Sequence, residues 1–295
     1  MHKNFIDQLK HKTLIFDGAM GTMLMEAGQA SARSPVLLNV EQPDLVAEIH
    51  RRYYEAGADV VIANTFGGNP LKLAADGLEQ QMAQLNRQGA LLARRACPPG
   101  KFVAGDIGPS GKMLMPLGDI SPEDMEHNFF QQAEVLIEGG VDLIAIETMY
   151  SLEEALTAVS GARRAGDVLL LASMTFTRTK NGFFTMMGES VAQCTAVLEK
   201  AGANMLGANC TLNSSDTIGL TEALRASTRL PLLIQPNAGK PVTRQGVTRY
   251  EQSPSEFAAD AVKIKAAGAD MIGGCCGTTP EFIRAVKEQI SALNV

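Results

Sequence analysis

A short motif recurs four times along the chain, each time directly before an apolar run. Its second residue is always glycine, and the four copies are Ala56–Asp59, Gly139–Asp142, Ala201–Asn204 and Ala267–Asp270. A glycine at this place is typical of the left-handed residue that ends a helix. Each copy therefore predicts a helix that is followed at once by a strand, and the repetition predicts a fold built from βα units.

Apolar runs with the composition of strands occur eight times. They are Leu14–Asp17, Val60–Asn64, Phe102–Asp106, Leu143–Glu147, Leu169–Thr175, Met205–Asn209, Leu232–Gln235 and Met271–Gly274. The runs are continuous rather than alternating, which is typical of parallel strands covered on both faces.

Helix signals fall between these runs. A helix is predicted over Asp44–Glu55, and Ser121-Pro122-Glu123 and Thr279-Pro280 have the form of helix starts. Capping boxes are predicted for Ser151 with Glu154 and for Ser253 with Glu256. The fold class expected from this alternation is α/β, a single (β/α)8 TIM barrel formed by residues 1–295 as one domain. An open doubly wound sheet is the alternative.

The charge balance bears on possible partners. The 295 residues include 26 Lys and Arg against 32 Asp and Glu, a net charge of −6, without a block of like charge. We therefore expect no nucleic-acid partner and no membrane partner. The first residues lack the apolar segment of a signal peptide, so a cytoplasmic location is expected. Five cysteines in such a chain favour a metal site or catalysis over disulfides.

Three of the cysteines follow predicted strands, where a barrel has its active site. Cys210 follows the sixth run, and Cys275 and Cys276 follow the eighth. These run ends are separated by one strand, roughly 10 Å, a gap that zinc–sulfur bonds of about 2.3 Å can bridge. Three thiolates leave one position of a tetrahedral Zn²⁺ open, which suggests catalysis. Cys97 and Cys194 are interpreted as small apolar residues.

Other polar residues also follow the strands. Carboxylates stand at Asp17, Asp106 and Glu147, and Asn237 follows the seventh run, between the two cysteine-bearing strands. Position alone leaves open that the carboxylates only cap helices or order loops. Asn237 or a water is the expected fourth ligand before a substrate binds.

At these residues the sequence resembles a known family. The matching motifs are Asp17–Thr22, Asn64–Gly67, Glu147-Thr148, Asn209-Cys210, Pro236–Gly239 and Gly273–Pro280. They are similar to those of the homocysteine S-methyltransferase family, above all its cobalamin-dependent branch. The resemblance implies a TIM barrel, zinc on Cys210, Cys275 and Cys276, and homocysteine sulfur as the fourth ligand. It also implies that Asp17, Thr65 and Glu147 grip the amino acid.

The chemistry of the implied site can be examined independently. A free thiol is mostly protonated at neutral pH, and its thiolate is the nucleophile. Zinc with four thiolate ligands carries a formal charge of 2 − 4 = −2, which keeps a bound substrate sulfur electron-rich. This set favours methyl transfer to sulfur over hydrolysis. We expect Glu147, with Asp17, to hold the ammonium group, and backbone N–H groups of Gly18, Ala19 and Met20 to bind the carboxylate.

The methyl donor is the least constrained part of the prediction. The resemblance implies methylcobalamin, and we expect a separate corrinoid protein to carry it, because only a terminal helix follows the last predicted strand. Loops 108–120 and 176–188, with Met113, Met115, Met186 and Met187, are the expected contact surface. Alternatives are S-methylmethionine or a betaine as donor, or a non-catalytic barrel that binds a thiol or an amino acid.

Overall fold

Eight parallel strands form the centre of the molecule. The computed structural model describes residues 2–29, 34–244 and 247–293. The sheet order is β1-β12-β9-β8-β5-β4-β3-β2, and a bridge between Phe16 and Val60 joins its two edges into a closed barrel. The strands are β1 (Leu14–Ile15), β2 (Val60–Ile62), β3 (Phe102–Ile107), β4 (Leu143–Met149), β5 (Leu169–Met174), β8 (Met205–Asn213), β9 (Leu232–Asn237) and β12 (Met271–Ile272).

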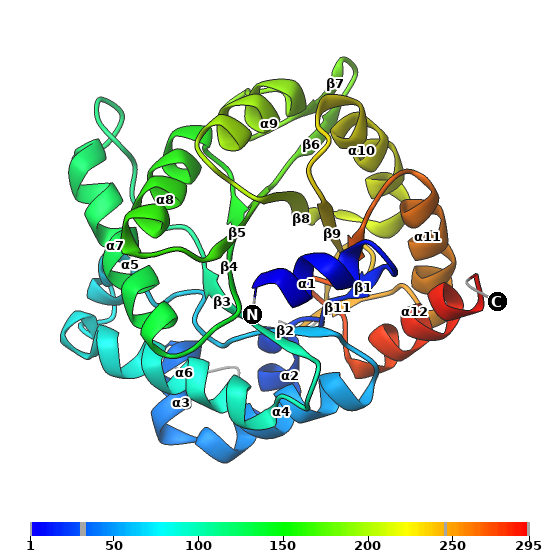
Figure 1. The fold of residues 1–295 in the computed structure, drawn as a ribbon, viewed down its shortest axis with the longest axis horizontal. Coiled ribbons are helices and arrows are strands. Elements are labelled where there is room, and N and C mark those ends of the chain that lie inside the picture. The colour runs from blue at the N-terminus through cyan, green and yellow to red at the C-terminus, as the bar shows by residue number, and fades with distance from the viewer. Residues whose placement is uncertain (1, 30–33, 245–246, 294–295) are drawn as a thin grey trace.

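Helices surround the barrel, as Figure 1 shows. The α-helices are α1 (His2–Leu9), α2 (Met20–Glu26), α3 (Leu38–Glu41), α4 (Pro43–Glu55), α5 (Pro70–Ala74), α6 (Met82–Ala96), α7 (Pro122–Glu138), α8 (Leu152–Ala165), α9 (Val191–Lys200), α10 (Ser214–Ser227), α11 (Pro254–Ala266) and α12 (Pro280–Ala292). Two short 3₁₀ helices are η1 (Pro35–Leu37) and η2 (Glu79–Gln81). The predicted (β/α)8 barrel is confirmed.

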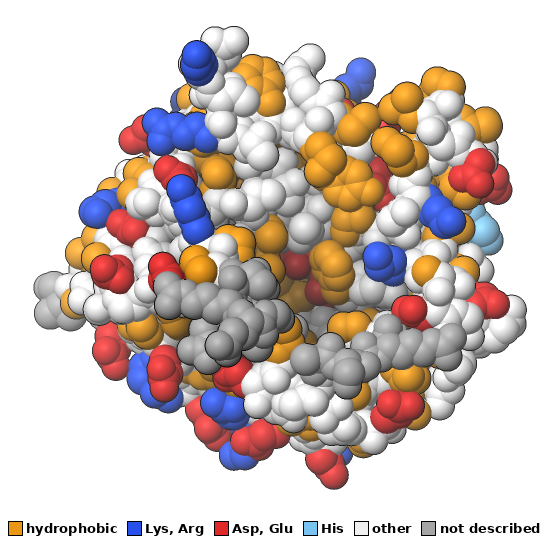
Figure 2. Space-filling model, turned by 180° about the vertical axis from the view of Figure 1, so that it is seen from behind, with side chains coloured by type: hydrophobic (Ala, Val, Ile, Leu, Met, Phe, Trp, Pro, Cys, Tyr) orange, Lys and Arg blue, Asp and Glu red, His pale blue; other side chains and the backbone are white. Residues whose placement is uncertain are grey.

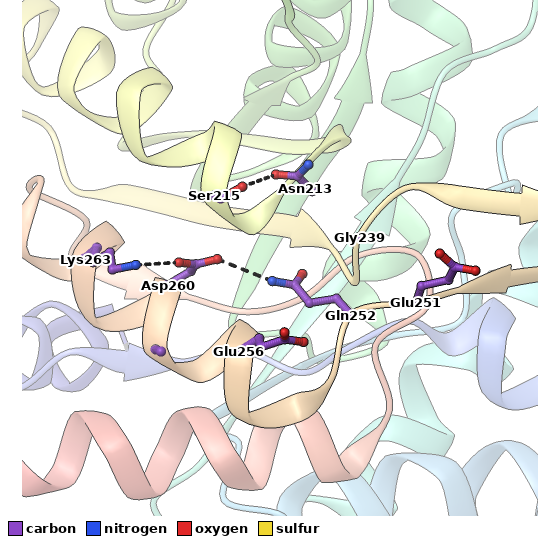
Figure 3. A pocket seen from close by; sticks show the side chains of 9 residues that line it. Asn213, Ser215, Gly239, Glu251, Gln252, Glu256, Asp260 and Lys263 are labelled. Carbon is purple, nitrogen blue, oxygen red and sulfur yellow. Dashed lines mark hydrogen bonds and ion pairs between the residues drawn. The ribbon is translucent and has the colours of Figure 1, made fainter.

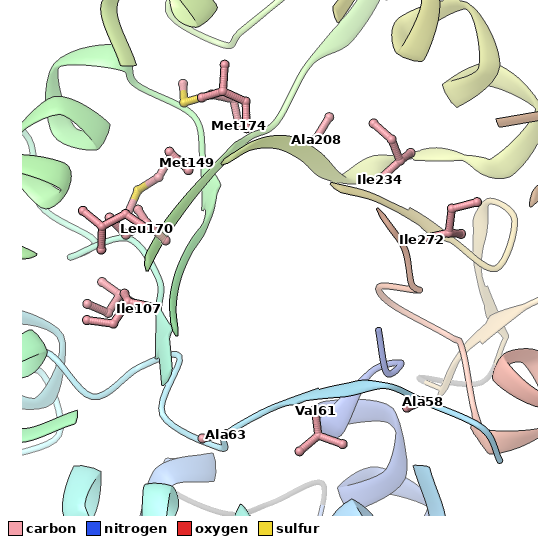
Figure 4. Packing of buried hydrophobic residues seen from close by; sticks show 14 of the residues in the cluster. Ala58, Val61, Ala63, Ile107, Met149, Leu170, Met174, Ala208, Ile234 and Ile272 are labelled. Atoms are coloured by element: carbon pink, nitrogen blue, oxygen red, sulfur yellow. The ribbon is translucent and has the colours of Figure 1, made fainter. Parts of the chain in front are cut away.

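Residues of each strand alternate between two cores. Outward-facing residues such as Val61, Leu170 and Ile234 pack against the helices, and Figure 4 shows them pointing away from the barrel interior. Inward-facing residues such as Ala104 and Ala145 form a separate inner cluster, as the strand period of two requires. Phe5 of α1 belongs to this inner cluster, so the first helix, which crosses the ring in Figure 1, closes one end of the barrel.

The four glycine joins have a common geometry. Gly57, Gly140, Gly202 and Gly268 all have positive φ, between 81° and 113°. The side chain of the last residue in each join accepts a hydrogen bond from one backbone N–H group at the start of a neighbouring strand. The acceptor–donor pairs are Asp59 with Ile15, Asp142 with Val103, Asn204 with Leu170, and Asp270 with Leu232. Each join thus ends a helix and also ties two strands together.

Some local predictions differ from the structure. Two antiparallel hairpins were not predicted: β6 (Thr177–Thr179) with β7 (Gly182–Phe184), and β10 (Pro241–Arg244) with β11 (Val247–Tyr250). Their strands are only three or four residues long, too short to show the apolar runs that mark the barrel strands. The capping box at Ser253 and Glu256 is confirmed. The one at Ser151 is wrong in its second half, because the Glu154 carboxylate accepts hydrogen bonds from Ser110 instead.

Among the described residues, no helix combines the length and the apolar character needed to cross a bilayer.

Candidate metal and substrate site

Three sulfur atoms converge at the open end of the barrel. The Sγ atoms of Cys210, Cys275 and Cys276 all lie within 4.8 Å of one another, and Cys210 and Cys276 are 4.0 Å apart. Tetrahedral zinc with bonds of about 2.3 Å holds its sulfurs about 3.8 Å apart. The triad is therefore close to the dimensions that a zinc ion requires.

The backbone bends at both cysteine segments. Cys210 and Thr211 have φ of 60° and 54°, a left-handed conformation that is uncommon for residues other than glycine. Gly277, directly after the cysteine pair, has φ of 84°, and a Cβ there would lie 2.3 Å from the ring of Tyr250. No glycine stands beside Cys210 in the sequence to mark this bend. Such strained residues cluster at functional sites.

The three thiols do not ionise independently. Hydrogen bonds from Cys275 and Cys276 lower the pKa of the Cys210 thiol to about 3. The same coupling raises the pKa of Cys275 and of Cys276, because each now faces a thiolate. Cys210 therefore loses its proton readily, whereas Cys275 and Cys276 keep theirs in the absence of a metal. A cation between the sulfurs favours the thiolate form of all three, as in a zinc site.

An asparagine connects the sulfurs to the neighbouring strands. Asn209 Nδ2 donates to Thr148 Oγ1 at 2.7 Å and lies 3.9 Å from Cys275 Sγ. Its Oδ1 accepts from Thr148 N at 2.9 Å and from Ser173 Oγ at 2.8 Å. This buried network fixes the end of β4 against the cysteine-bearing strand β8.

Three buried carboxyl groups share the same end of the barrel. Burial raises the pKa of Asp17, Asp106 and Glu147, that of Glu147 to about 7. Nearby negative charge adds to this effect, from Glu147 on the two aspartates and from Cys210 on Glu147. Asp17 Oδ2 accepts from Ile62 N at 2.9 Å, while its Oδ1 has no partner.

A pocket of about 300 Å³ joins the thiols to two of these carboxyl groups, Asp106 and Glu147, whereas Asp17 lies behind its wall. Its walls include Asp106, Glu147, the three cysteines, Gly18–Thr22, Met25, Phe66 and Tyr250. In Figure 2 it is the central hollow, with acidic side chains inside and hydrophobic side chains around its rim. A pocket that is mainly apolar with a few convergent polar groups is typical of a small-molecule site.

Several residues expected at the site lie behind the pocket wall. Thr65 is fully buried, and its Oγ1 is bonded to the backbone of Asp106. Asn237 is buried with its Oδ1 unpartnered, and its side chain contributes a hydrogen bond to Cys210. Ala19 lines the pocket, but its N–H is directed at the backbone and side-chain oxygens of Thr278. Gly18 is required for close packing, since a Cβ there would lie 2.6 Å from Thr278 Oγ1.

One lining residue was missed by the sequence analysis. Tyr250 ends β11 of the second hairpin, packs over Gly277 and forms a hydrogen bond with Cys276. Nothing in the sequence around Tyr250 marks it, because the hairpin that brings it to the pocket has no apolar alternation. Its proximity to the sulfurs comes from the tertiary structure.

A second, more open hollow of about 490 Å³ lies between the start of α10 and α11. Its polar groups include Asp260, which accepts from Lys263 at 2.9 Å and also faces Gln252 and Ser214, as Figure 3 partly shows. The Asp260 carboxylate already has Lys263, Gln252 and Ser214 as hydrogen-bond donors. This hollow therefore contains no buried charge that a ligand would have to neutralise. The thiol-lined pocket is therefore the candidate site.

Comparisons with known proteins agree with this assignment. The sequence model of the family described as "Homocysteine S-methyltransferase" matches residues 14–290. Two curated relatives are the methionine synthases of Mycobacterium leprae and Mycobacterium tuberculosis, 31% and 32% identical over 99% and 98% of this chain. The alignments cover 25% of each relative, so the chain spans about a quarter of their length.

Solved structures give the same result. The metallated form of the homocysteine methyltransferase MmuM from Escherichia coli superimposes with a TM-score of 0.81 at 28% identity, covering 97% of this chain and 99% of that one. Its apo form gives 0.76 at 29% identity over 97% and 98%. The carboxyl transferase domain of Rhizobium etli pyruvate carboxylase, at 16% identity, a TM-score of 0.55, and coverage of 99% of this chain and 50% of that one, shares the fold alone.

Proposed function

Because the chain belongs to the homocysteine S-methyltransferase family, we propose that it transfers a methyl group to the sulfur of homocysteine and releases methionine. The observation that carries this proposal is the convergence of three thiols on a pocket that also holds buried carboxyl groups. Homocysteine has a thiol at one end and an ammonium group at the other. The cysteine triad is complementary to the thiol through a shared metal ion, and the carboxyl groups are complementary to the ammonium group. Residues 1–295 would act as a single catalytic domain.

The thiol triad supports a zinc cofactor. Cys210, Cys275 and Cys276 would hold the ion, and bound there zinc would keep the substrate sulfur ionised and electron-rich. Asn237, whose Oδ1 has no partner near Cys210, is the proposed fourth ligand before substrate arrives. The MmuM relative has been crystallised in a metallated form, which is consistent with this cofactor.

The carboxyl groups support recognition of the amino-acid end. Glu147 lines the pocket, and Asp17 lies beside it with a free Oδ1, so the two are placed to hold the ammonium group. Gly18 and Ala19 would lie along the substrate carboxylate. Thr65, bonded to the backbone of Asp106, acts indirectly by keeping β2 and β3 in register. Holding both ends places the sulfur for in-line attack on the methyl carbon.

A methylcorrinoid on a separate protein is the proposed donor. In the transfer, the new S–CH₃ bond forms as the donor–CH₃ bond breaks, and that bond's electron pair stays on the donor. A large carrier needs an accessible docking surface, and exposed apolar side chains occur in segments that follow the strands. More than one third exposed are Met25 and Phe66 of the pocket lining, and Met113, Met115, Leu117, Met186 and Met187 of the segments after β3 and β5. Exposed apolar surface of this kind marks protein interaction sites.

The test is a donor panel at constant zinc and homocysteine. Methylcobalamin free and bound to a corrinoid protein, S-methylmethionine and glycine betaine are compared by the rate of methionine formation. We expect turnover with the protein-bound corrinoid. Turnover with S-methylmethionine and none with either corrinoid would overturn the donor assignment alone. Absence of methionine with every donor, zinc being bound, would favour the non-catalytic binding protein instead.

A further inference from the structure

Asp106 is a pocket residue without an assigned task. It lies on β3, two residues after Ala104 of the inner cluster, so its side chain faces the barrel interior. Glu147 also faces the interior, from the adjacent strand β4. It lies two residues beyond Ala145, the residue paired with Asp106, and so one layer nearer the open end. Both carboxyl groups line the pocket, and the charge of Glu147 acts on Asp106.

The environment of Asp106 does not stabilise a negative charge. The side chain is 6% exposed, its Oδ1 has no hydrogen-bond partner, and no donor is directed at its carboxyl group from the described residues. The lining of the pocket, as far as the structure describes it, contains no Lys or Arg. A buried charge without a partner is costly, and such a group keeps its proton instead.

Two charged groups face Asp106. Glu147 faces it from β4 and Asp17 from the end of β1, and both raise the pKa of Asp106 beyond the effect of burial. Cys210 on β8 acts on Glu147 rather than on Asp106. Homocysteine brings a single ammonium group to this set of three carboxyl groups. Bound beside Asp106, that ammonium group would stabilise the Asp106 anion, whose Oδ1 has no hydrogen-bond partner among the described residues.

We propose that Asp106 is a specificity-determining residue of the pocket: it is a neutral acid while the pocket is empty, and it becomes a third carboxylate for the substrate ammonium group, beside Glu147 and Asp17, once that group binds. This inference rests on the proposed function and deepens it. The O–H bond of Asp106 breaks on binding, its electrons stay on the carboxylate and its proton passes to solvent. A ligand without the ammonium group does not favour ionisation of Asp106, so it binds less tightly than homocysteine.

The first test measures the proton directly. L-methionine, the product, has an ammonium group and no thiol, so its binding releases no thiol proton. Calorimetric titration of the zinc-loaded protein near neutral pH, in two buffers of different ionisation enthalpy, gives the number of protons released. Glu147 and Asp17, whose pKa values are also raised, contribute protons in both proteins. We therefore expect wild type to release about one proton more than Asp106→Asn with methionine, and neither to release a proton when 4-(methylthio)butanoate replaces methionine.

The second test measures discrimination. The ratio of kcat/KM for homocysteine to that for 4-mercaptobutanoate, which lacks only the amino group, should fall about tenfold or more in Asp106→Asn, the scale of one charge-assisted hydrogen bond. Asp142→Asn is the matched control. It makes the same change at a buried aspartate whose carboxylate accepts from Arg94 and from Val103 N, away from the pocket. Its ratio and proton release should match wild type.

The outcomes separate the two proposals. No proton release by wild type with methionine, or equal release and equal discrimination in Asp106→Asn, overturns the role of Asp106 even if methyl transfer is normal. A zinc-loaded wild type that binds neither homocysteine nor methionine overturns the proposed function itself. If Asp106→Asn folds poorly, Asp106→Ser replaces it in both tests, because Glu147 and Asp17 also contribute to the protons that wild type releases and a variant is needed to identify the share of Asp106.

Discussion

The two ends of the barrel treat buried carboxylates in opposite ways. At the end closed by α1, Asp59 accepts from Lys101 at 2.7 Å, from Lys12 at 2.9 Å and from Ile15 N at 3.1 Å. Burial alone would raise the pKa of Asp59, but these hydrogen bonds outweigh it and hold the pKa below its ordinary value. At the open end, Asp106 and Glu147 face no cation in the described lining, and their pKa values are raised.

Asp59 thus differs from Asp106 and Glu147 in whether the protein itself supplies the positive partner of the carboxyl group. The partners of Asp59 come from the protein itself, so its charge contributes to folding. The carboxyl groups at the open end have no cationic partner in the described lining. Groups with strongly shifted pKa values of this kind are typical of functional sites. The missing cations would be the zinc ion at the thiols and the ammonium group at the carboxylates. The predictions below alter one end at a time.

The largest effect is expected from the thiols. Cys210→Ala, Cys275→Ala and Cys276→Ala should each abolish stoichiometric zinc and lower methyl transfer roughly a thousandfold, because the ion supplies several kcal/mol to the transition state. Metal analysis and the assay measure both. The barrel should stay folded, since its core does not depend on the metal. Cys97→Ala, outside the pocket, is the control, and one zinc per chain in any of the three variants would remove that cysteine from the ligand set.

The next largest effect is expected from Glu147. Glu147→Gln should weaken homocysteine binding by about 2–4 kcal/mol, roughly 30- to 1000-fold in KM, since an ammonium group then loses its carboxylate. Zinc content should remain that of wild type. Glu154→Gln is the matched control: Glu154 is a buried glutamate near the mouth that accepts from Ser110 and does not line the pocket. A normal KM in Glu147→Gln would place the ammonium group elsewhere.

A smaller change is expected from Asp59, at the closed end. Asp59→Asn should lower the free energy of unfolding by about 1–3 kcal/mol, because it removes the ion pairs of a buried carboxylate with Lys12, Lys101 and Lys287. Thermal unfolding measures this. A depressed pKa means that the wild-type contribution is present at neutral pH and is lost as pH falls below the ordinary value of 3.8. The two proteins should therefore converge in stability at acid pH, while activity is unaffected.

The smallest effect has the opposite sign. Asp106→Asn should raise the stability of the substrate-free protein by up to about 1 kcal/mol, since a buried carboxyl group without a partner opposes folding once it can ionise. A raised pKa means that wild type loses stability as pH rises above the ordinary value of 3.8. The gain should thus be absent at acid pH and should grow toward neutral pH. If Asp106→Asn has a lower free energy of unfolding than wild type at neutral pH, then Asp106, like Asp59, stabilises the fold, and the two ends of the barrel do not differ in this respect.

Much of the fold was predictable because its signals are local. The glycine joins at Gly57, Gly140, Gly202 and Gly268 each combine a helix end with a strand start, and all four have the expected positive φ. The hairpin that ends at Tyr250 was not predictable in the same way, because its strands contain no continuous apolar run. Glu154 shows a similar limit. Its spacing from Ser151 fits a capping box, but tertiary contact with Ser110 takes its carboxylate.

The sequence by itself determined that the cysteines and the carboxyl groups share one end of the molecule. The carboxyl ends of parallel strands must meet at one edge, so residues that follow strands converge whatever the loops do. Only the tertiary structure decided which of these residues have partners. Asp59 is surrounded by lysines and Asp106 by carboxyl groups, yet each simply adjoins an apolar strand in the sequence. Pairing of charges depends on distances between elements far apart in the chain, and no local pattern encodes those distances.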